Sequence, residues 1–150
     1  MNKLISIIVF LLSIVLSGFI NRPAACNFFQ NSITFGYLDK GDSIQFQFGE
    51  QKKIKVGSME FDLDKRRNEI KRVNLAGDFN GWSPENTMFV MKKTDNKLYE
   101  LVVSKKSIGK KGEVHKFKFV LNGEYWIEPP QEALNKITGS DHNTNLYLKL

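Results

Sequence analysis

Cysteine is almost absent from this chain, which has one residue of that type, Cys26, in 150 positions. A single thiol cannot form an internal disulfide, so a hydrophobic core has to hold the fold together. Histidine is also scarce, and neither His115 nor His142 has a cysteine or histidine partner at the spacing of a zinc site. We therefore expect no bound metal.

Sequence signatures of catalysis are missing as well. The chain contains no Gly-x-Ser-x-Gly elbow and no phosphate-binding loop. Its 150 residues allow one ordinary domain, and they are too few for a catalytic (β/α)8 barrel, which needs roughly 250 residues. We expect neither enzymatic activity nor a cofactor.

Basic residues outnumber acidic residues, which gives a formal net charge of +6. The excess is spread over pairs such as Lys52-Lys53, Lys92-Lys93 and Lys110-Lys111, most of which flank turns or alternate with acids. Nucleic-acid binding needs a concentrated basic stripe, so we expect no nucleic-acid partner. Lysine at strand edges instead discourages aggregation between strands.

The first 25 residues have the pattern of a secretory signal peptide. A short positive start at residues 1–3 precedes an almost wholly apolar run at residues 4–20, which ends at Asn21-Arg22-Pro23. The alternative is an uncleaved anchor, although the apolar run is a little shorter than the about 20 residues that a membrane span needs. We expect an exported protein of the periplasm or outer envelope.

Cys26 follows this segment directly, in the sequence Pro23-Ala24-Ala25-Cys26. Ala-Ala-Cys resembles the end of a bacterial lipoprotein signal, in which the cysteine is lipidated and anchors the protein in a membrane. Pro23 departs from that pattern, because an aliphatic residue is usual there. Two interpretations remain open: lipidation of Cys26, or ordinary cleavage near Ala25 that leaves a free thiol.

The rest of the chain alternates between apolar and polar residues in short runs. Residues 44–48 and 146–150 place their apolar side chains on one face, which is typical of an antiparallel sheet with one solvated side. Asn122-Gly123 lies between two apolar runs and predicts a hairpin that pairs residues 114–121 with 125–128. The expected strands are residues 33–38, 43–48, 52–56, 59–63, 69–76, 87–92, 98–103, 114–121, 125–127 and 145–150.

Helices are not expected to contribute much. Residues 130–138 allow a single helical turn, confined by Pro129-Pro130 and Gly139, and no amphipathic helix of convincing length appears. Short strands separated by turns at regular spacing predict an all-β fold, an antiparallel β-sandwich.

Two aromatic turns are the most informative features of the chain. Residues 75–82 read Leu-Ala-Gly-Asp-Phe-Asn-Gly-Trp, in which Gly77, Asn80 and Gly81 can adopt the positive φ angles of a tight turn. Phe79 can then point into the core, whereas Trp82 remains at the end of the turn as an exposed flat surface. A second aromatic turn follows at residues 117–126, and two such turns suit carbohydrate binding.

Residues 75–82, together with residues 118–125 and Glu128-Pro129, resemble the glycogen-binding domain of the β subunit of AMP-activated protein kinase. The same module, carbohydrate-binding module family 48, begins glycogen branching enzymes and isoamylases. The resemblance covers residues 70–150 and implies an immunoglobulin-like (early-set) sandwich that binds α-1,4-linked glucan without catalysis. We expect residues 26–69 to be an N-terminal β elaboration of this sandwich, because about 40 residues rarely support their own core.

The resemblance also implies a set of binding residues. Trp82 matches one of the family's two tryptophans, and Lys118 matches a lysine that contacts glucose hydroxyls. The second ring is Tyr125 by register or Trp126 by residue type, and strand alternation allows only one of the two to face the sugar.

Thr144 and Asn145 lie where the family has polar contacts before its last strand, although this segment also reads as a simple polar loop. The rival function is a structural or protein-interaction module of the cell envelope that has lost sugar binding. Burial of Trp82 against residues 27–69, or an inward second ring, would favour that rival and an envelope protein partner.

Overall fold

The computed structural model describes residues 35–49, 52–94 and 98–150, all of which belong to one compact unit. The expected signal peptide, Cys26 and the start of the strand expected at residues 33–38 lie outside these residues. No helix in the described ranges is both long and apolar enough to cross a membrane.

Strands dominate the described part of the chain. They are β1 (Phe35–Asp39), β2 (Ser43–Gly49), β3 (Lys53–Val56), β4 (Met59–Asp62), β5 (Val73–Gly77), β6 (Lys92–Lys93), β7 (Leu98–Ser104), β8 (Val114–Leu121), β9 (Tyr125–Trp126), β10 (Lys136–Thr138) and β11 (Thr144–Lys149). The helical pieces are α1 (Leu63–Arg66), η1 (Arg67–Glu69), η2 (Asp78–Asn80), η3 (Thr87–Phe89) and η4 (Lys105–Ser107).

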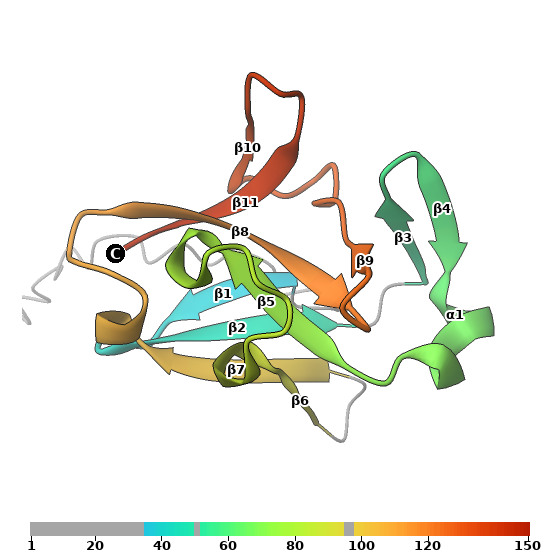
Figure 1. The fold of residues 1–150 in the computed structure, drawn as a ribbon, viewed down its shortest axis with the longest axis horizontal. Helices are drawn as coiled ribbons and strands as arrows, with labels where there is room; N and C mark the ends of the chain where they lie inside the picture. Colours follow the sequence, from blue (N-terminus) through green and yellow to red (C-terminus); the bar gives the residue numbers. More distant parts are fainter. Residues whose placement is uncertain (1–34, 50–51, 95–97) are drawn as a thin grey trace, which may run out of the picture. The chain divides into compact units, whose positions relative to one another are not determined.

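The strands form two antiparallel sheets and a separate hairpin (Figure 1). One sheet has the order β1-β2-β7-β6, the other has the order β10-β11-β8-β5 with β9 also paired to β8, and β3 pairs only with β4 in the hairpin. Aromatic rings join the two sheets: the centroids of Phe46 and Phe117 lie 5.3 Å apart, as do those of Phe48 and Phe119. The all-β sandwich that the sequence predicts is confirmed.

Strand alternation builds the core between the sheets. Ile44, Phe46 and Phe48 of β2 are fully buried, and Phe117 and Phe119 of β8 face them. Burying side chains of this size contributes roughly 1.5–3 kcal/mol each, so the core can stabilise the domain without a disulfide.

The sheet that contains β8 divides along that strand. β11 pairs with residues 114–117 of β8, whereas β9 pairs with Val120 and Leu121 near its end. Figure 1 shows β9 between the β10–β11 hairpin and the β3–β4 hairpin. β8 thus has β11 beside its first half and β9 beside its last two residues, and the outward-facing Lys118 and Val120 are buried.

The β3–β4 hairpin is joined to the chain that follows β9. Val56 forms a bridge with Ile127, and the backbone N–H of Glu128 donates to the carbonyl oxygen of Lys55 at 2.8 Å. Ile54 is buried within the common hydrophobic core. This part of residues 26–69 therefore shares its core with the sandwich.

Three stretches differ from the sequence-based expectation. The strand expected at residues 69–76 begins only at Val73, because η1 ends at Glu69 and an irregular segment follows it. The strand predicted at residues 87–92 is largely wrong: the Asn86 side chain accepts from the N–H of Met88 at 3.0 Å and starts η3, leaving only two residues for β6. Within 130–138, where a helical turn is allowed, the chain forms the strand β10. All residues of β10 are exposed, so no alternation of burial marks it in the sequence.

Candidate functional site

The first aromatic turn is held by one asparagine. The Asn80 side chain accepts a hydrogen bond from the N–H of Gly77 at 2.9 Å and donates to the carbonyl oxygens of Leu75 at 2.9 Å and Ser83 at 3.3 Å. These bonds replace backbone pairing where β5 ends. The residues of the turn thus supply much of its own support.

The positive φ angles of this turn fall at Gly81 (62°) and Trp82 (59°). Of the three residues that can adopt them, only Gly81 does so, because Asn80 lies in η2 and Gly77 is extended, with φ −173°. Gly77 is needed for a different reason: a Cβ at this position would clash with the carbonyl oxygen of Lys116 in the neighbouring strand.

Asp78 fixes the orientation of the Trp82 ring. One carboxylate oxygen accepts from the indole N–H of Trp82 at 3.0 Å, and the other accepts from the backbone N–H of Lys116 at 2.8 Å. Phe79 points the other way, as expected, and its ring stacks on Phe89 at 4.9 Å. Trp82 itself is partly buried rather than fully exposed as expected.

Trp126 supplies the second ring of the site. Tyr125 pairs with Leu121, which faces the core, so Trp126 pairs with Val120 and lies on the opposite face of the sheet. The ring centroids of Trp82 and Trp126 are 6.4 Å apart, with 35° between the ring planes. The two tryptophan rings are therefore direct neighbours, with their planes inclined to each other.

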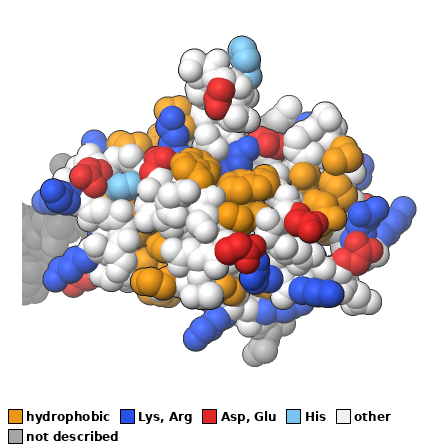
Figure 2. Space-filling model, in the orientation of Figure 1, with side chains coloured by type: hydrophobic (Ala, Val, Ile, Leu, Met, Phe, Trp, Pro, Cys, Tyr) orange, Lys and Arg blue, Asp and Glu red, His pale blue; other side chains and the backbone are white. Residues whose placement is uncertain are grey.

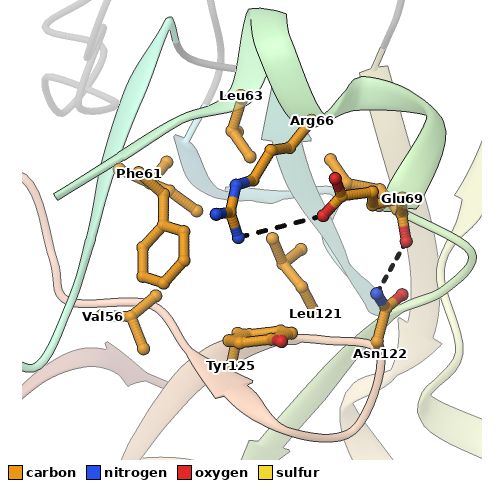
Figure 3. Close-up of a pocket in the computed structure, with 10 residues that line it drawn as sticks. Val56, Phe61, Leu63, Arg66, Glu69, Leu121, Asn122 and Tyr125 are labelled. Carbon is orange, nitrogen blue, oxygen red and sulfur yellow. Dashed lines mark hydrogen bonds and ion pairs between the residues drawn. The ribbon is translucent and has the colours of Figure 1, made fainter. Parts of the chain in front are cut away.

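Tyr125, the residue that the register of the resemblance favours, lies away from Trp82. Its ring meets Phe61 edge-on at 5.7 Å and lines a small apolar pocket of about 30 Å³ (Figure 3). The Arg66 guanidinium lies 5.1 Å from the centre of the Phe61 ring and 3.9 Å from the Glu69 carboxylate. Tyr125 thus belongs to the packing of the β3–β4 hairpin.

The two tryptophans line an open cleft of about 580 Å³ where the sheet divides. Figure 2 shows hydrophobic side chains gathered near the middle of this face, with Lys, Arg, Asp and Glu side chains around them. The cleft is lined by Val56, Gly57, Asp78, Trp82, Lys116, Lys118, Trp126, Glu128, Gly139, Asp141, Asn143 and Asn145.

Lys118 lies within the cleft and is held by an ion pair. Its side chain is 7% exposed, and its Nζ donates to the Glu128 carboxylate at 2.6 Å. A buried ammonium without such a partner would be costly, so the two residues depend on each other. The Lys118 ammonium has three N–H donors, and Glu128 accepts one of them among the described residues. The other two could donate to hydroxyl groups of a ligand.

Polar groups of the β10–β11 hairpin line another part of the cleft. Asn145 lines it, whereas the Thr144 hydroxyl is hydrogen-bonded to that of Thr138 at 3.0 Å and is not among the lining residues. Hydrogen bonds from the side chain and backbone of Asn143 lower the pKa of Asp141, so this carboxylate stays ionised at neutral pH.

Several residues of the cleft were not predicted from the sequence. Two of them could have been found from the sequence. Asp78 belongs to the first aromatic turn, and Lys116 is expected on the same face of its strand as Lys118 because the two are two residues apart. Gly57 carried no such signal, because its hairpin lies far away in the sequence and meets the cleft only through tertiary packing.

The charges that line the cleft are mixed: two lysines and three carboxylates. No cluster of three or more His, Cys, Asp and Glu side chains that could hold a metal occurs among the described residues. The arrangement offers apolar ring faces beside hydrogen-bond donors and acceptors. A neutral ligand with one apolar face and a polar rim fits this chemistry.

No protein-family model matches the chain, and a search of curated proteins finds no match. The resemblance to the glycogen-binding module therefore rests on residues 75–82, 118–125 and Glu128-Pro129 alone.

Proposed function

We propose that this protein is a non-catalytic module that binds α-1,4-linked glucan, such as glycogen or a starch-like polysaccharide. Trp82 and Trp126 would stack on the C–H faces of glucose rings, while Lys118 and Asn145 would bond the hydroxyl groups. The observation that carries this proposal is the pair of tryptophan rings 6.4 Å apart in an open cleft.

The shape and chemistry of the cleft support this class of ligand. Tryptophan combines a large apolar face with one polar edge, which suits the amphipathic face of a sugar. The 35° angle between the two rings suits a curved chain better than a flat one, and α-1,4-linked glucan is curved. The resemblance of residues 75–82 and 118–125 points to the same ligand.

We expect weak binding, in the micromolar to millimolar range, or about 4 to 8 kcal/mol. Two rings and a few hydrogen bonds have to offset the ordering of a flexible chain. The proposed setting is the cell envelope, reached through the signal peptide at residues 1–25, with Cys26 either lipidated in a membrane or left as a free thiol.

Affinity electrophoresis tests the proposal. The purified protein would be run through native gels with and without glycogen, beside the Trp82→Ala variant. We expect glycogen to retard the wild type and not the variant. Ser83→Ala is a matched control in the same turn, because its side chain does not line the cleft.

A folded wild type that glycogen does not retard would contradict the proposal. The sandwich would then be interpreted as a structural or protein-interaction module of the envelope, and the next experiment would be a search for its protein partner.

A further inference from the structure

The β3–β4 hairpin contributes a wall to the cleft. Val56 and Gly57, at the turn between the two strands, line the cleft together with Trp82 and Trp126. This hairpin lies within residues 26–69, outside the part of the chain that resembles the glycogen-binding module. The wall is therefore a property of this chain that the resemblance does not supply.

Contacts on both faces fix the hairpin in place. Its bridge from Val56 to Ile127 and the bond from Glu128 to Lys55 tie it to the segment that follows Trp126. On the inner face, Phe61 is held between Tyr125 and the Arg66 guanidinium (Figure 3). A hairpin anchored at this many points presents its turn at a defined position.

The β10–β11 hairpin borders another part of the same cleft. Gly139, Asp141 and Asn143 of its turn line the cleft, and hydrogen bonds within the turn hold Asp141 to Asn143. The two tryptophans therefore share their cleft with residues of both hairpins, and Figure 1 shows β9, which carries Trp126, between these hairpins.

We propose that the β3–β4 hairpin turns the glucan site into a groove that takes a single solvated chain. Residues of the hairpin turn and of the β10–β11 turn line the cleft beside the tryptophans, and on this proposal they exclude the side-by-side chains of a starch granule. Val56 and Gly57 set this selectivity by contacting the bound chain. The inference rests on the proposed function and names the physical form of its ligand.

Gly57 offers a variant that tests the wall with little disturbance to the fold. Its φ is 58°, in the left-handed region that asparagine tolerates, and no atom lies within 4 Å of a Cβ built there. Gly57→Asn therefore adds a side chain at the edge of the cleft. Gly41→Asn is the matched control, with φ 82°, the same free space and a position outside the cleft.

The experiment measures maltoheptaose binding by calorimetry and co-sedimentation with granular starch. We expect Gly57→Asn to bind maltoheptaose roughly tenfold more weakly than Gly41→Asn, a difference of about 1.4 kcal/mol. We expect the wild type to bind maltoheptaose and to stay in solution when the granules are pelleted. An affinity of Gly57→Asn equal to that of the control, or wild-type binding to granules as tight as to maltoheptaose, would overturn the inference.

The same experiment separates this inference from the proposed function. If the wild type binds neither maltoheptaose nor granules, both fall. If binding depends on Trp82 but is the same in Gly57→Asn and Gly41→Asn, the glucan-binding function stands and only the hairpin's role is rejected.

Discussion

At the scale of single residues, the site depends on polar side chains that hold its aromatic rings. Asn80 replaces the missing backbone bonds at the end of β5, and Asp78 links the indole of Trp82 to the backbone of β8. These bonds fix Trp82 before any ligand arrives. Binding then costs less conformational entropy than it would with a mobile ring.

Replacing Asp78 with asparagine tests this preorganisation. One oxygen of Asp78 accepts from the indole N–H of Trp82, and the other accepts from the backbone N–H of Lys116. An asparagine amide would present an NH2 group to one of these two donors, and that hydrogen bond would be lost. We expect Asp78→Asn to lower the free energy of unfolding by about 1–2 kcal/mol and to weaken maltoheptaose binding. Urea denaturation and calorimetry measure the two effects.

A variant with unchanged glucan affinity would show that the Asp78 carboxylate does not position the ring. Glu132→Gln is a suitable control for the loss of one negative charge, since Glu132 is exposed and lies outside the cleft.

The choice between Tyr125 and Trp126 could have been made from the sequence. Phe117, Phe119 and Leu121 alternate inward, and a three-residue turn at 122–124 pairs Leu121 with Tyr125. Tyr125 therefore lies on the side of the β3–β4 hairpin, against Phe61 and still partly exposed, and Trp126 faces the cleft. The register of the resemblance favours Tyr125 instead, because it counts residues along the chain between Lys118 and Pro129. It does not take account of which residues pair across the turn.

At the scale of elements, strands with clear alternation were predicted well and exposed or irregular ones were not. β2, β7 and β8 each place apolar residues at every second position, such as Phe117, Phe119 and Leu121 of β8, so their period of two is visible in the sequence. β10 buries nothing, and η3 depends on a cap by Asn86. The pairing of β8 with β9 follows from the Asn122-Gly123 turn between them, whereas its pairing with β11 has no local signal because the two strands are far apart in the sequence.

An ion pair joins two connections at one end of the sandwich. Lys105 of η4 donates to the Asp39 carboxylate at 2.7 Å, and the N–H of Gly41 donates to its other oxygen at 2.9 Å. The hydrogen bond from Lys105, with that from Gly41, lowers the pKa of Asp39 below its ordinary value of 3.8. The ionised Asp39 carboxylate therefore adds to the free energy of unfolding above pH 3.8. This contribution is lost as the pH falls through the lowered pKa of Asp39.

Asp39→Asn should therefore reduce the free energy of unfolding at neutral pH by less than about 1 kcal/mol, because water screens this exposed pair. The difference between wild type and variant should vanish as the pH falls below the lowered pKa of Asp39. Urea titrations at a series of pH values measure it. A difference that persists in strong acid would mean that Asp39 acts through packing rather than charge.

At the scale of the whole domain, the candidate site and the hydrophobic core occupy different faces of the same sheet. The inner face of β8 packs against β2 through phenylalanine rings, and its outer face carries Lys118 into the cleft beside Trp126. The chain's net charge of +6 is not concentrated there, because the cleft mixes lysines with carboxylates. Glucan binding should accordingly depend little on salt.

Tryptophan fluorescence during a maltoheptaose titration tests the central claim most directly. The chain has only two tryptophans, and both line the cleft, so the emission reports on this site alone. We predict a saturable change in emission with a Kd between micromolar and millimolar. Trp126→Ala should abolish the saturable change of the remaining Trp82, whereas Tyr125→Ala should retain it. No change in the folded wild type, or a loss with Tyr125→Ala but not with Trp126→Ala, would contradict the account.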